Sequence, residues 1–413
     1  MSRITVITAG HLSTCPRMLK AAESLSADGH DVRVVSTNFV EWGRVADSDL
    51  RARLQLPWNV IDYSRTSGNG LRVCSGIRFH ACRALAKTIG PERLSQRLLG
   101  RAATRIFDEL VGEIADAPAD LIYGGGGALV ATAEAARRLR APFAIDLEDF
   151  HGEEHSPSEP DGVFSNQLAK AAERVVFREA TLLTTASDAI ADRYRDTYGK
   201  RPLVINNTFA LPKRAPEFVP IDGSGLRLYW FSQTIGPGRG IEDAINAAGL
   251  AAIRCELHLR GNPLGGYLDR LHSTAREKAP QLKLVHHPPE PPDRMVDLCR
   301  DYHVGLALEL DAPPNRAICL TNKAFTYILA GLAVVFTDTP GQRKMAEDLG
   351  AGAFMYHPGD VEALAQAFKR WAVNPEALLD ARKSAWEAAQ RRWHWEHELE
   401  EGALLRAVRS VLR

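Results

Sequence analysis

The feature that most constrains the fold of this chain is a regular alternation of short apolar runs with longer segments of helical periodicity. Runs that are apolar throughout predict strands buried on both faces, and helix-length segments between them predict parallel crossovers. In the first half these runs lie at residues 4–8, 32–36, 121–123, 143–147, 182–185 and 203–206. The same rhythm restarts at residues 226–231 and continues to about residue 337. The sequence therefore predicts an α/β chain with two doubly wound, Rossmann-like domains.

A stretch without periodicity, LPKRAPEFVPIDGSG at residues 211–225, separates the two halves. Its proline and glycine content is typical of a linker between domains. We therefore expect a first domain at residues 1–210 and a second at residues 226–385. Doubly wound sheets bind ligands beyond the carboxyl ends of their strands, so the functional site is expected there, in a central cleft between the domains.

Composition and charge exclude several classes of protein. Lys plus Arg and Asp plus Glu number 51 each among 413 residues, which gives no basic excess for nucleic-acid binding. No apolar run reaches the length of a membrane span, and the start, MSRITVITAG, lacks the pattern of a signal peptide. Six scattered cysteines form no C-x-x-C pair, so we expect core cysteines rather than a zinc ribbon or disulfides. The expected location is the cytoplasm.

Two segments of the second half suggest an anion site. The turn GPGRG at residues 236–240 lies between a predicted strand and helix, where Gly238 lets the backbone approach an anion and Arg239 supplies a positive charge. A plain strand-to-helix turn is the alternative. Further on, Thr321 or Asn322 can cap a helix whose first turn carries Lys323, a second cation able to pair with phosphate. A solvated surface lysine is the alternative there.

The second of these segments resembles a family motif. Residues 322–335, NKAFTYILAGLAVV, are similar to the N-K-x-F-E-Y-x-x-A-G-x-P-V-V pattern of GT-B glycosyltransferases, particularly the retaining family-four-like (glycosyltransferase group 1) enzymes. Other similar segments follow in the family's order: GHDVRVV at 29–35, TTASD at 184–188, Tyr198-Gly199, Asn206-Asn207, LRGN at 259–262, PGD at 358–360 and WHWE at 393–396. The resemblance covers nearly the whole chain. It also implies a C-terminal helix, residues 386–413, that crosses back to the first domain.

The resemblance implies a nucleotide-diphosphate sugar as donor, held in the second domain without a metal or other cofactor. Arg239 and Lys323 would hold the diphosphate, and Gln233 falls near the place of another cationic ligand. The chain departs from the family where two carboxylates are usual, because it has Ile318 and Thr326 instead. A Thr326 hydroxyl could still reach a ribose hydroxyl.

The nearby Glu309 could substitute for a missing carboxylate, although a loop carboxylate is more often merely solvated.

An acidic segment follows the predicted strand at residues 143–147. Residues 141–169 contain seven acidic residues and no Lys or Arg. Clustered carboxylates raise one another's pKa, so Glu148 and Asp149, with His151, are predicted to act as a general base or to orient an acceptor hydroxyl. A solvated acidic loop is the alternative. Residues 151–155, HGEEH, also fit the H-x-x-E-H zinc pattern, but a glycine inside it and prolines after it oppose the required helix, so no metal is expected.

Three further residues are expected to contact the acceptor in the first domain. His11 and Arg17 lie in the loop and helix after the first strand, and Gly125 belongs to a run of four glycines after the strand at 121–123. Residues 65–105 hold nine Lys or Arg and one acid, with apolar residues interleaved. This segment resembles the basic amphipathic face by which many GT-B enzymes contact anionic membranes, here at the inner face of the membrane. A solvated helix face and a patch for an anionic acceptor are the alternatives.

The sequence therefore predicts a metal-independent glycosyltransferase that moves a sugar to an acceptor hydroxyl of a saccharide, a lipid-linked saccharide or a small molecule. A sugar-nucleotide epimerase of the same architecture and a non-catalytic nucleotide-sugar-binding partner subunit are the rival hypotheses. The resemblance favours retention of anomeric configuration, and the acidic segment leaves inversion open.

Overall fold

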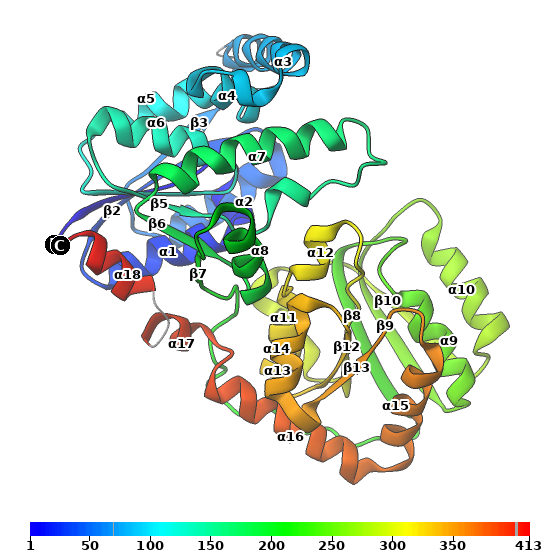
Figure 1. Cartoon of the computed structure of the whole chain (residues 1–413). Helices are drawn as coiled ribbons and strands as arrows, with labels where there is room; N and C mark the ends of the chain where they lie inside the picture. The colour runs from blue at the N-terminus through cyan, green and yellow to red at the C-terminus, as the bar shows by residue number, and fades with distance from the viewer. Residues whose placement is uncertain (69, 401–403) are drawn as a thin grey trace. The chain divides into compact units, whose positions relative to one another are not determined.

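The chain folds into two compact units in a computed structural model that describes residues 1–68, 70–400 and 404–413 (Figure 1). The first unit consists of Met1–Ile205 together with Glu398–Arg413, and the second of Asn206–His397. Each unit is built on a parallel sheet between helices. The predicted pair of doubly wound α/β units is therefore confirmed.

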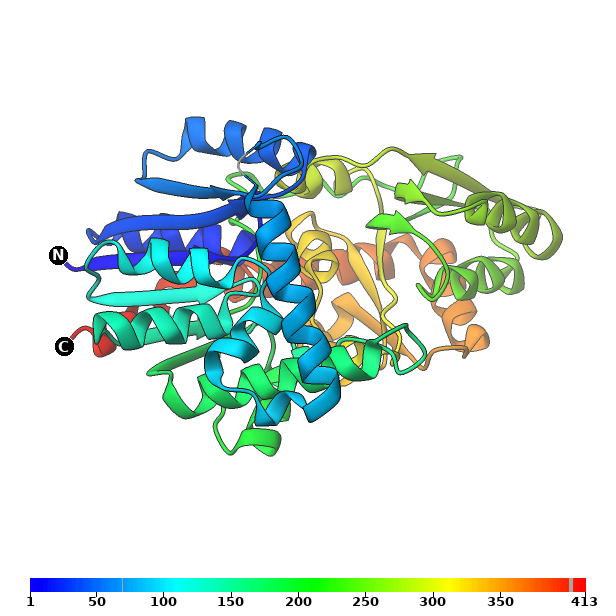
Figure 2. The ribbon, with the colours of Figure 1, turned by 90° about the horizontal axis from the view of Figure 1, so that it is seen from above.

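The first unit contains a seven-stranded sheet of order β3-β2-β1-β4-β5-β6-β7. Its strands are β1 (Arg3–Thr8), β2 (Asp31–Asn38), β3 (Trp58–Asp62), β4 (Leu121–Gly125), β5 (Phe143–Asp146), β6 (Leu182–Thr185) and β7 (Leu203–Val204). Its helices are α1 (Pro16–Ala27), α2 (Glu41–Arg53), α3 (Leu71–Ile89), α4 (Gln96–Ala103), α5 (Phe107–Ala115), α6 (Leu129–Leu139), α7 (Gly162–Glu179), α8 (Asp188–Tyr198) and α18 (Leu404–Val411). Helices α5, α6 and α7 cover one face and α1 and α18 the other, and the strands run side by side in Figure 2. The order of the strands reverses between β1 and β4, so ligands are expected at that edge.

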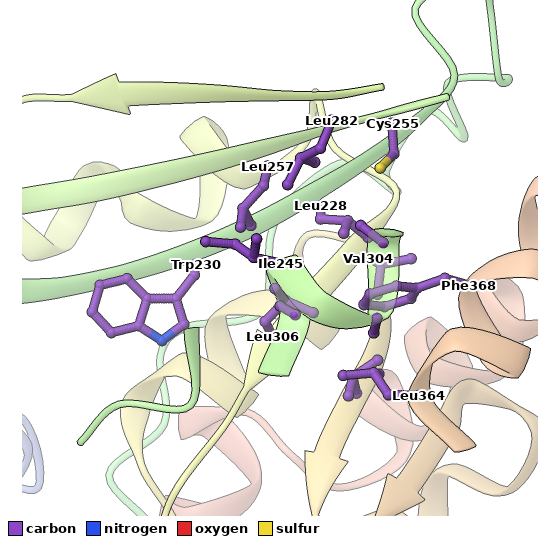
Figure 3. Close-up of a cluster of buried hydrophobic side chains, with 14 of the residues drawn as sticks. Leu228, Trp230, Ile245, Cys255, Leu257, Leu282, Val304, Leu306, Leu364 and Phe368 are labelled. Atoms are coloured by element: carbon purple, nitrogen blue, oxygen red, sulfur yellow. The ribbon is translucent and has the colours of Figure 1, made fainter. Parts of the chain in front are cut away.

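The second unit contains a six-stranded sheet of order β10-β9-β8-β11-β12-β13. Its strands are β8 (Leu226–Ile235), β9 (Cys255–Pro263), β10 (Leu282–His287), β11 (Val304–Ala307), β12 (Ala333–Thr337) and β13 (Ala353–Tyr356). Its helices are α9 (Ile241–Ala251), α10 (Tyr267–Lys278), α11 (Met295–Cys299), α12 (Pro314–Ile318), α13 (Asn322–Leu329), α14 (Pro340–Leu349), α15 (Val361–Val373) and α16 (Pro375–Arg391). One face is closed by Leu228, Leu257 and Leu306 of the sheet packing on Ile245 and Phe368 of the helices (Figure 3).

The boundary between the units differs from the predicted one. It falls after Ile205, and the segment predicted as a linker, residues 211–225, belongs to the second unit. There the carbonyl of Val219 accepts a hydrogen bond of 2.7 Å from Nη1 of Arg382, and Pro216 packs against Gly331. Packing on these side chains, which local composition does not reveal, makes this segment part of the second unit.

The predicted C-terminal helix, residues 386–413, is divided in the structure. Residues up to His397 cluster with the second unit, where α16 ends at Arg391, and only Glu398–Arg413 cluster with the first. A short helix, α17 (Trp395–Glu400), spans this change, and residues 401–403 of the predicted helix lie outside the described residues. Within the part of the chain that the structure describes, no helix is both long and apolar enough to cross a membrane.

Candidate functional site

A glycine turn opens the carboxyl edge of the second sheet. Gly240 caps α9 with a φ of 70°, and a Cβ there would lie 2.8 Å from the Cβ of Leu308. The position therefore requires glycine. Gly238 is exposed with a φ of 72°, and its carbonyl accepts a hydrogen bond of 3.1 Å from Nη1 of Arg316. Arg316, on α12, thus joins the turn although the sequence analysis did not select it.

Arg239 belongs to this turn and lies near Arg316 of α12. It is half-buried, and its guanidinium makes no hydrogen bond or ion pair with any described residue. Burial lowers the pKa of Arg239, the neighbouring Arg316 lowers it further, and Glu309 opposes both effects. Neither guanidinium group forms an ion pair with a described carboxylate, so the two together favour an anion.

Lys323 lies in the first turn of α13 and pairs with Glu309. Its Nζ is 2.6 Å from Oε1 of Glu309, and both side chains are buried. The hydroxyl of Thr321 donates to the same oxygen at 3.1 Å. Burial raises the pKa of Glu309, but Lys323, Thr321 and Arg316 outweigh it, so the pKa lies below its ordinary value. We call Arg239, Arg316, Lys323 and Glu309 the cationic cluster, which holds three positive groups and one negative group.

Three other predicted donor ligands have weaker support. Thr326 is fully buried, and its hydroxyl donates to the carbonyl of Asn322 at 2.8 Å within the same helix. Because this bond satisfies the hydroxyl inside the helix, the predicted ribose contact of Thr326 is not supported. Asn322 is half-buried at the start of α13, and Gln233 is exposed on β8. Both stay candidates for donor contacts.

In the first unit, the two polar side chains predicted to bind the acceptor are buried. His11 is fully buried, and its Nε2 accepts from the backbone N–H groups of Phe39 and Val40 at 3.4 Å each. The ring proton must then lie on Nδ1, which donates to Oδ2 of Asp47 at 3.2 Å. His11 therefore organises the loop after β1 and the start of α2, and the expected acceptor contact is not supported.

Arg17 is likewise engaged inside the unit. Its Nε and Nη2 donate to the two carboxylate oxygens of Asp146 at 2.7 and 2.5 Å, and its Nη1 donates to the carbonyl of Ile205. Thr184 also donates to Asp146 at 2.7 Å, and its hydroxyl lies 2.8 Å from that of Tyr123. This fully buried network ties α1 to β5 and β6, so Arg17 acts as a positioning residue rather than as an acceptor ligand.

In the run of four glycines at the end of β4, the exposed residues are not the one that was predicted to contact the acceptor, Gly125. Gly125 is buried beneath Met18, whose Sδ would lie 2.9 Å from an added Cβ. Gly126 and Gly127 are exposed with φ values of 51° and 82°. If backbone approaches a ligand here, these two residues offer it.

Glu148 is the carboxylate of the acidic segment that has no partner. Its backbone has a φ of 50°, which is costly for a residue with a side chain. Its carbonyl accepts from the hydroxyl of Thr185 at 3.1 Å and from the N–H of Ala186 at 3.2 Å, which holds this conformation. The side chain is half-buried and makes no hydrogen bond with any described residue.

The surroundings of Glu148 favour its neutral form. Burial raises the pKa of Glu148 to about 7, with added effects from Asp146 and Asp149 and opposition from Arg17. A strained backbone that presents an unpartnered carboxyl group is typical of a functional position.

A buried carboxylate that the sequence analysis missed anchors the rest of this segment. Glu173, on α7, accepts from the N–H of Gly152 at 3.0 Å and from the hydroxyls of Tyr194 and Tyr198 at 2.9 and 2.6 Å. The sequence signal that could have revealed Glu173 is an acidic residue at a helix position where the periodicity predicts an apolar one. Asp149, half-buried, lies at the start of the segment that Glu173 holds.

His151 differs from Glu148 in its expected charge. Burial lowers the pKa of His151, but Glu154, whose Oε2 lies 3.2 Å from Nδ1, together with Glu173 and Asp149 raises it to about 9. The ring is therefore an imidazolium at neutral pH and can donate a hydrogen bond but cannot accept a proton.

The zinc pattern of residues 151–155 has no helix to support it. His151–Glu153 form a single 3₁₀ turn, and His155 pairs with Glu159 at 3.1 Å. No group of three or more His, Cys, Asp or Glu side chains suited to a metal ion occurs among the described residues.

The basic segment, residues 65–105, contains α3 and α4, and its residue 69 lies outside the described residues. Several of its cations pair with acids from outside the segment: Arg78 with Glu109, Lys87 with Asp161, and Arg97 and Arg101 with Asp108. The outward side of α3 exposes Val73, Ile77, Leu85 and Ile89. The segment is therefore less basic in the folded protein than in the sequence.

Comparison with known proteins finds similarity in sequence over part of the chain and in fold over nearly all of it. Residues 16–208 match the model described as a glycosyl transferase 4-like domain. No curated protein matches the chain. The fold is similar to that of Anabaena HepE solved with UDP, at 17% identity and a TM-score of 0.68 over 99% of this chain and 100% of that one. It is also similar to sucrose-phosphate synthase of Thermosynechococcus elongatus, at 13% identity and a TM-score of 0.63 over 99% and 100% of the two chains.

Proposed function

We propose that this chain is a glycosyltransferase that transfers a sugar from a nucleoside-diphosphate sugar to an acceptor hydroxyl, because residues 16–208 match a glycosyl transferase 4-like domain and the whole chain has the fold of GT-B glycosyltransferases. The observation that carries this proposal is the cationic cluster. It gathers three positive groups and one carboxylate beside an exposed glycine turn at the carboxyl edge of the second sheet. A nucleoside diphosphate is the ligand that such a cluster suits.

The cluster has a direct chemical role in this reaction. When the bond between the sugar's anomeric carbon and the diphosphate oxygen breaks, negative charge develops on the leaving diphosphate. Arg239 and Arg316 can donate charge-assisted hydrogen bonds to it from the turn, and Lys323 from the start of α13. These three side chains would supply the positive charge that a metal ion supplies in other sites. HepE, whose fold is similar, has been solved with UDP and with UDP-glucose, which makes uridine nucleotides the first donors to test.

Glu148 is the residue that we propose to accept the acceptor's proton or to orient its hydroxyl. A carboxyl group with a pKa of about 7 is matched to proton transfer near neutral pH. Asp149 and the His151 imidazolium lie in the same segment, where Asp149 raises and His151 lowers the pKa of Glu148. If the reaction inverts the anomeric centre, Glu148 is the base. If it retains the centre, the leaving phosphate takes the proton and Glu148 orients the acceptor.

The test of this proposal is the fate of a labelled donor. The full-length protein is incubated with radiolabelled UDP-sugars without acceptor, and the sugar is analysed. Slow release of free sugar, lost in Arg239→Gln and kept in the control Arg276→Gln on the exposed side of α10, is the expected result. An epimerised nucleotide sugar would instead identify an epimerase, and an unchanged donor that still binds would identify a non-catalytic subunit. None of the features described above favours either rival.

Peripheral contact with an anionic membrane stays a prediction, together with the expected cytoplasmic location at its inner face. The structure changes which side chains would make this membrane contact. Since several cations of residues 65–105 are paired, exposed apolar side chains such as Val73 and Ile77 of α3 would provide much of the contact.

A further inference from the structure

A pocket lies beyond the carboxyl ends of two strands of the first unit. It has a volume of about 380 Å³ and is lined by residues that follow β2 and β3 and by the first turn of α3. Its lining includes Phe39, Glu41, Ser64, Arg65, Thr66 and Arg72. It lies at the carboxyl edge of the sheet, after β2 and β3 rather than at the reversal of strand order between β1 and β4, and its volume is in the range of small-molecule sites.

Two arginines of the basic segment that form no ion pair with a described residue, Arg65 and Arg72, line this pocket. Arg65 is exposed and makes no ion pair with any described residue. Arg72 is half-buried and makes one weak hydrogen bond, to the carbonyl of Tyr63 at 3.4 Å. The acidic residue of the lining, Glu41, is already paired with Arg44. Two guanidinium groups therefore line a pocket whose lining carboxylate, Glu41, is already held by a third arginine.

The start of α3 adds to this positive potential. The helix runs over Leu71–Ile89, and its N-cap residue, Gly70, has no side chain that could cap it. Its first turn contains no acidic residue and includes Arg72, which lines the pocket. The N-terminus of a long helix attracts anions through its N–H groups and its dipole. Arg65, Arg72 and the helix thus act in the same direction.

The remaining lining suits a polyhydroxylated ligand. The hydroxyls of Ser64 and Thr66 lie 3.2 Å apart and can each donate or accept. Phe39 is half-buried, and its ring stacks on that of Tyr63 with centroids 5.6 Å apart, which makes a firm apolar wall. A sugar ring offers hydroxyls at its edge and C–H groups on its faces, so it can use both kinds of surface.

We propose that the acceptor is an acidic saccharide, one that carries a carboxylate or a phosphate, and that the pocket around Arg65 and Arg72 binds its anionic group. This inference rests on the proposed function, because it names the class of acceptor for that reaction. Carboxylate and phosphate share the chemistry that two guanidinium groups recognise.

The experiment is calorimetric titration of the full-length protein with methyl glucuronide, glucose 6-phosphate and the neutral methyl glucoside. We expect whichever charged probe matches the acceptor to bind at least about tenfold more tightly than methyl glucoside, and added salt to weaken it. The double variant Arg65→Gln/Arg72→Gln should lose that preference. The control Arg93→Gln, an exposed arginine of the same basic segment outside the pocket, should keep it.

Two further variants separate this inference from the proposed function. Arg239→Gln should weaken UDP binding and leave the charged probe unaffected, whereas the double variant should do the reverse. Thr66→Trp, which narrows the pocket without changing its charge, should also lose the probe. Equal binding of neutral and charged probes, or loss of the charged probe in Arg239→Gln alone, would overturn the inference. The inference would also be overturned if the double variant no longer bound anionic lipid vesicles but still bound methyl glucuronide and glucose 6-phosphate, because the pocket would then recognise a membrane surface.

Discussion

The carboxyl edges of the two sheets both contain charged residues, but they differ in how those charges are neutralised. In the second unit, Arg239 and Arg316 stand beside a single carboxylate that Lys323 already holds. In the first unit, Arg17 and Asp146 neutralise each other completely inside the protein. The charge that is left after internal pairing, rather than the number of charged residues, therefore marks a ligand site. By that criterion the first unit offers Glu148 and the Arg65–Arg72 pocket.

The largest effect that tests this comparison is expected at Glu148. Glu148→Gln should lower kcat by about 10²–10⁴ if Glu148 is the general base, because the amide cannot accept a proton. Nucleotide affinity should not change. Steady-state kinetics with a saturating donor measure both quantities, with Glu159→Gln in the same segment as the control.

The pH dependence of the same reaction follows from the raised pKa of Glu148, about 7. A base acts when deprotonated, so kcat should fall as the pH falls through about 7 and level off above it.

If the reaction is retaining, Glu148→Gln and Asp149→Asn should mainly raise the acceptor KM. NMR of the product's anomeric proton decides between the two. A retained anomer with a defect in kcat alone would contradict both versions.

A second comparison concerns how much a buried ion pair, Arg17–Asp146, and an exposed one, Arg3–Asp120, each contribute to the free energy of unfolding. Arg17→Met should lower the free energy of unfolding by about 3–5 kcal/mol, because it leaves Asp146 buried and unpaired. Arg3→Met, which breaks the exposed pair with Asp120, should change it far less. Denaturant titration measures both variants. Equal effects would mean that the Arg17 network is not the internal support described above.

The Lys323–Glu309 pair is expected to respond in the same way within the second unit. Lys323→Met should destabilise that unit by about 3–5 kcal/mol at pH 7, and Glu309→Gln in addition should restore part of the loss. The pKa of Glu309 is lowered in the folded state, so its contribution is complete above the unfolded pKa and disappears as the pH falls through the folded one. Thermal unfolding at pH 7 and at pH 3 compares the variants. A variant as stable as the wild-type protein at pH 7 would refute the pair's role.

A smaller effect is expected at Arg239, whose guanidinium has no partner in the described chain. Arg239→Gln should weaken nucleoside diphosphate binding by about 10–100-fold, which is the usual range for a charge-assisted hydrogen bond, and should leave the melting temperature of the free protein nearly unchanged. Calorimetry measures the first and thermal unfolding the second. An unchanged affinity would place the diphosphate elsewhere.

The smallest effect is expected for membranes. Sedimentation with anionic liposomes should show modest binding that Ile77→Ser on α3 reduces, and high salt should weaken it only in part. Binding that high salt abolishes and Ile77→Ser leaves intact would restore the purely electrostatic hypothesis.

The sequence allowed the fold and the donor side to be predicted better than the acceptor side. Apolar runs and glycine turns are local signals, and Gly240 and Lys323 lie where a turn and a helix start must be. Whether a polar side chain faces a ligand or the interior depends on partners far away in the chain. His11 pairs with Asp47, and Arg17 with Asp146, across separations that no local pattern encodes.

The same reason explains the residues that were missed. Arg316 is recognisable only once α12 places it against the carbonyl of Gly238. Glu173 is recognisable only from the tyrosines that donate to it. The unpartnered state of Glu148 likewise follows from the fold around it, although its identity as an acidic residue after a strand was a local signal.

The unneutralised charge of the cationic cluster is expected to bind a nucleoside diphosphate. A thermal-unfolding series with UDP, GDP, ADP and dTDP tests it most directly. One nucleotide at about 100 times its Kd should stabilise the protein by about 2.7 kcal/mol, which raises the melting temperature of the second unit by about 5–10 °C. The shift should persist with EDTA and fall to about 0.4–1.4 kcal/mol in Arg239→Gln, whose affinity is expected to be about 10–100-fold lower. If no nucleotide changes the melting temperature, or if Arg239→Gln keeps the full shift, the cationic cluster is not the site that binds the nucleotide.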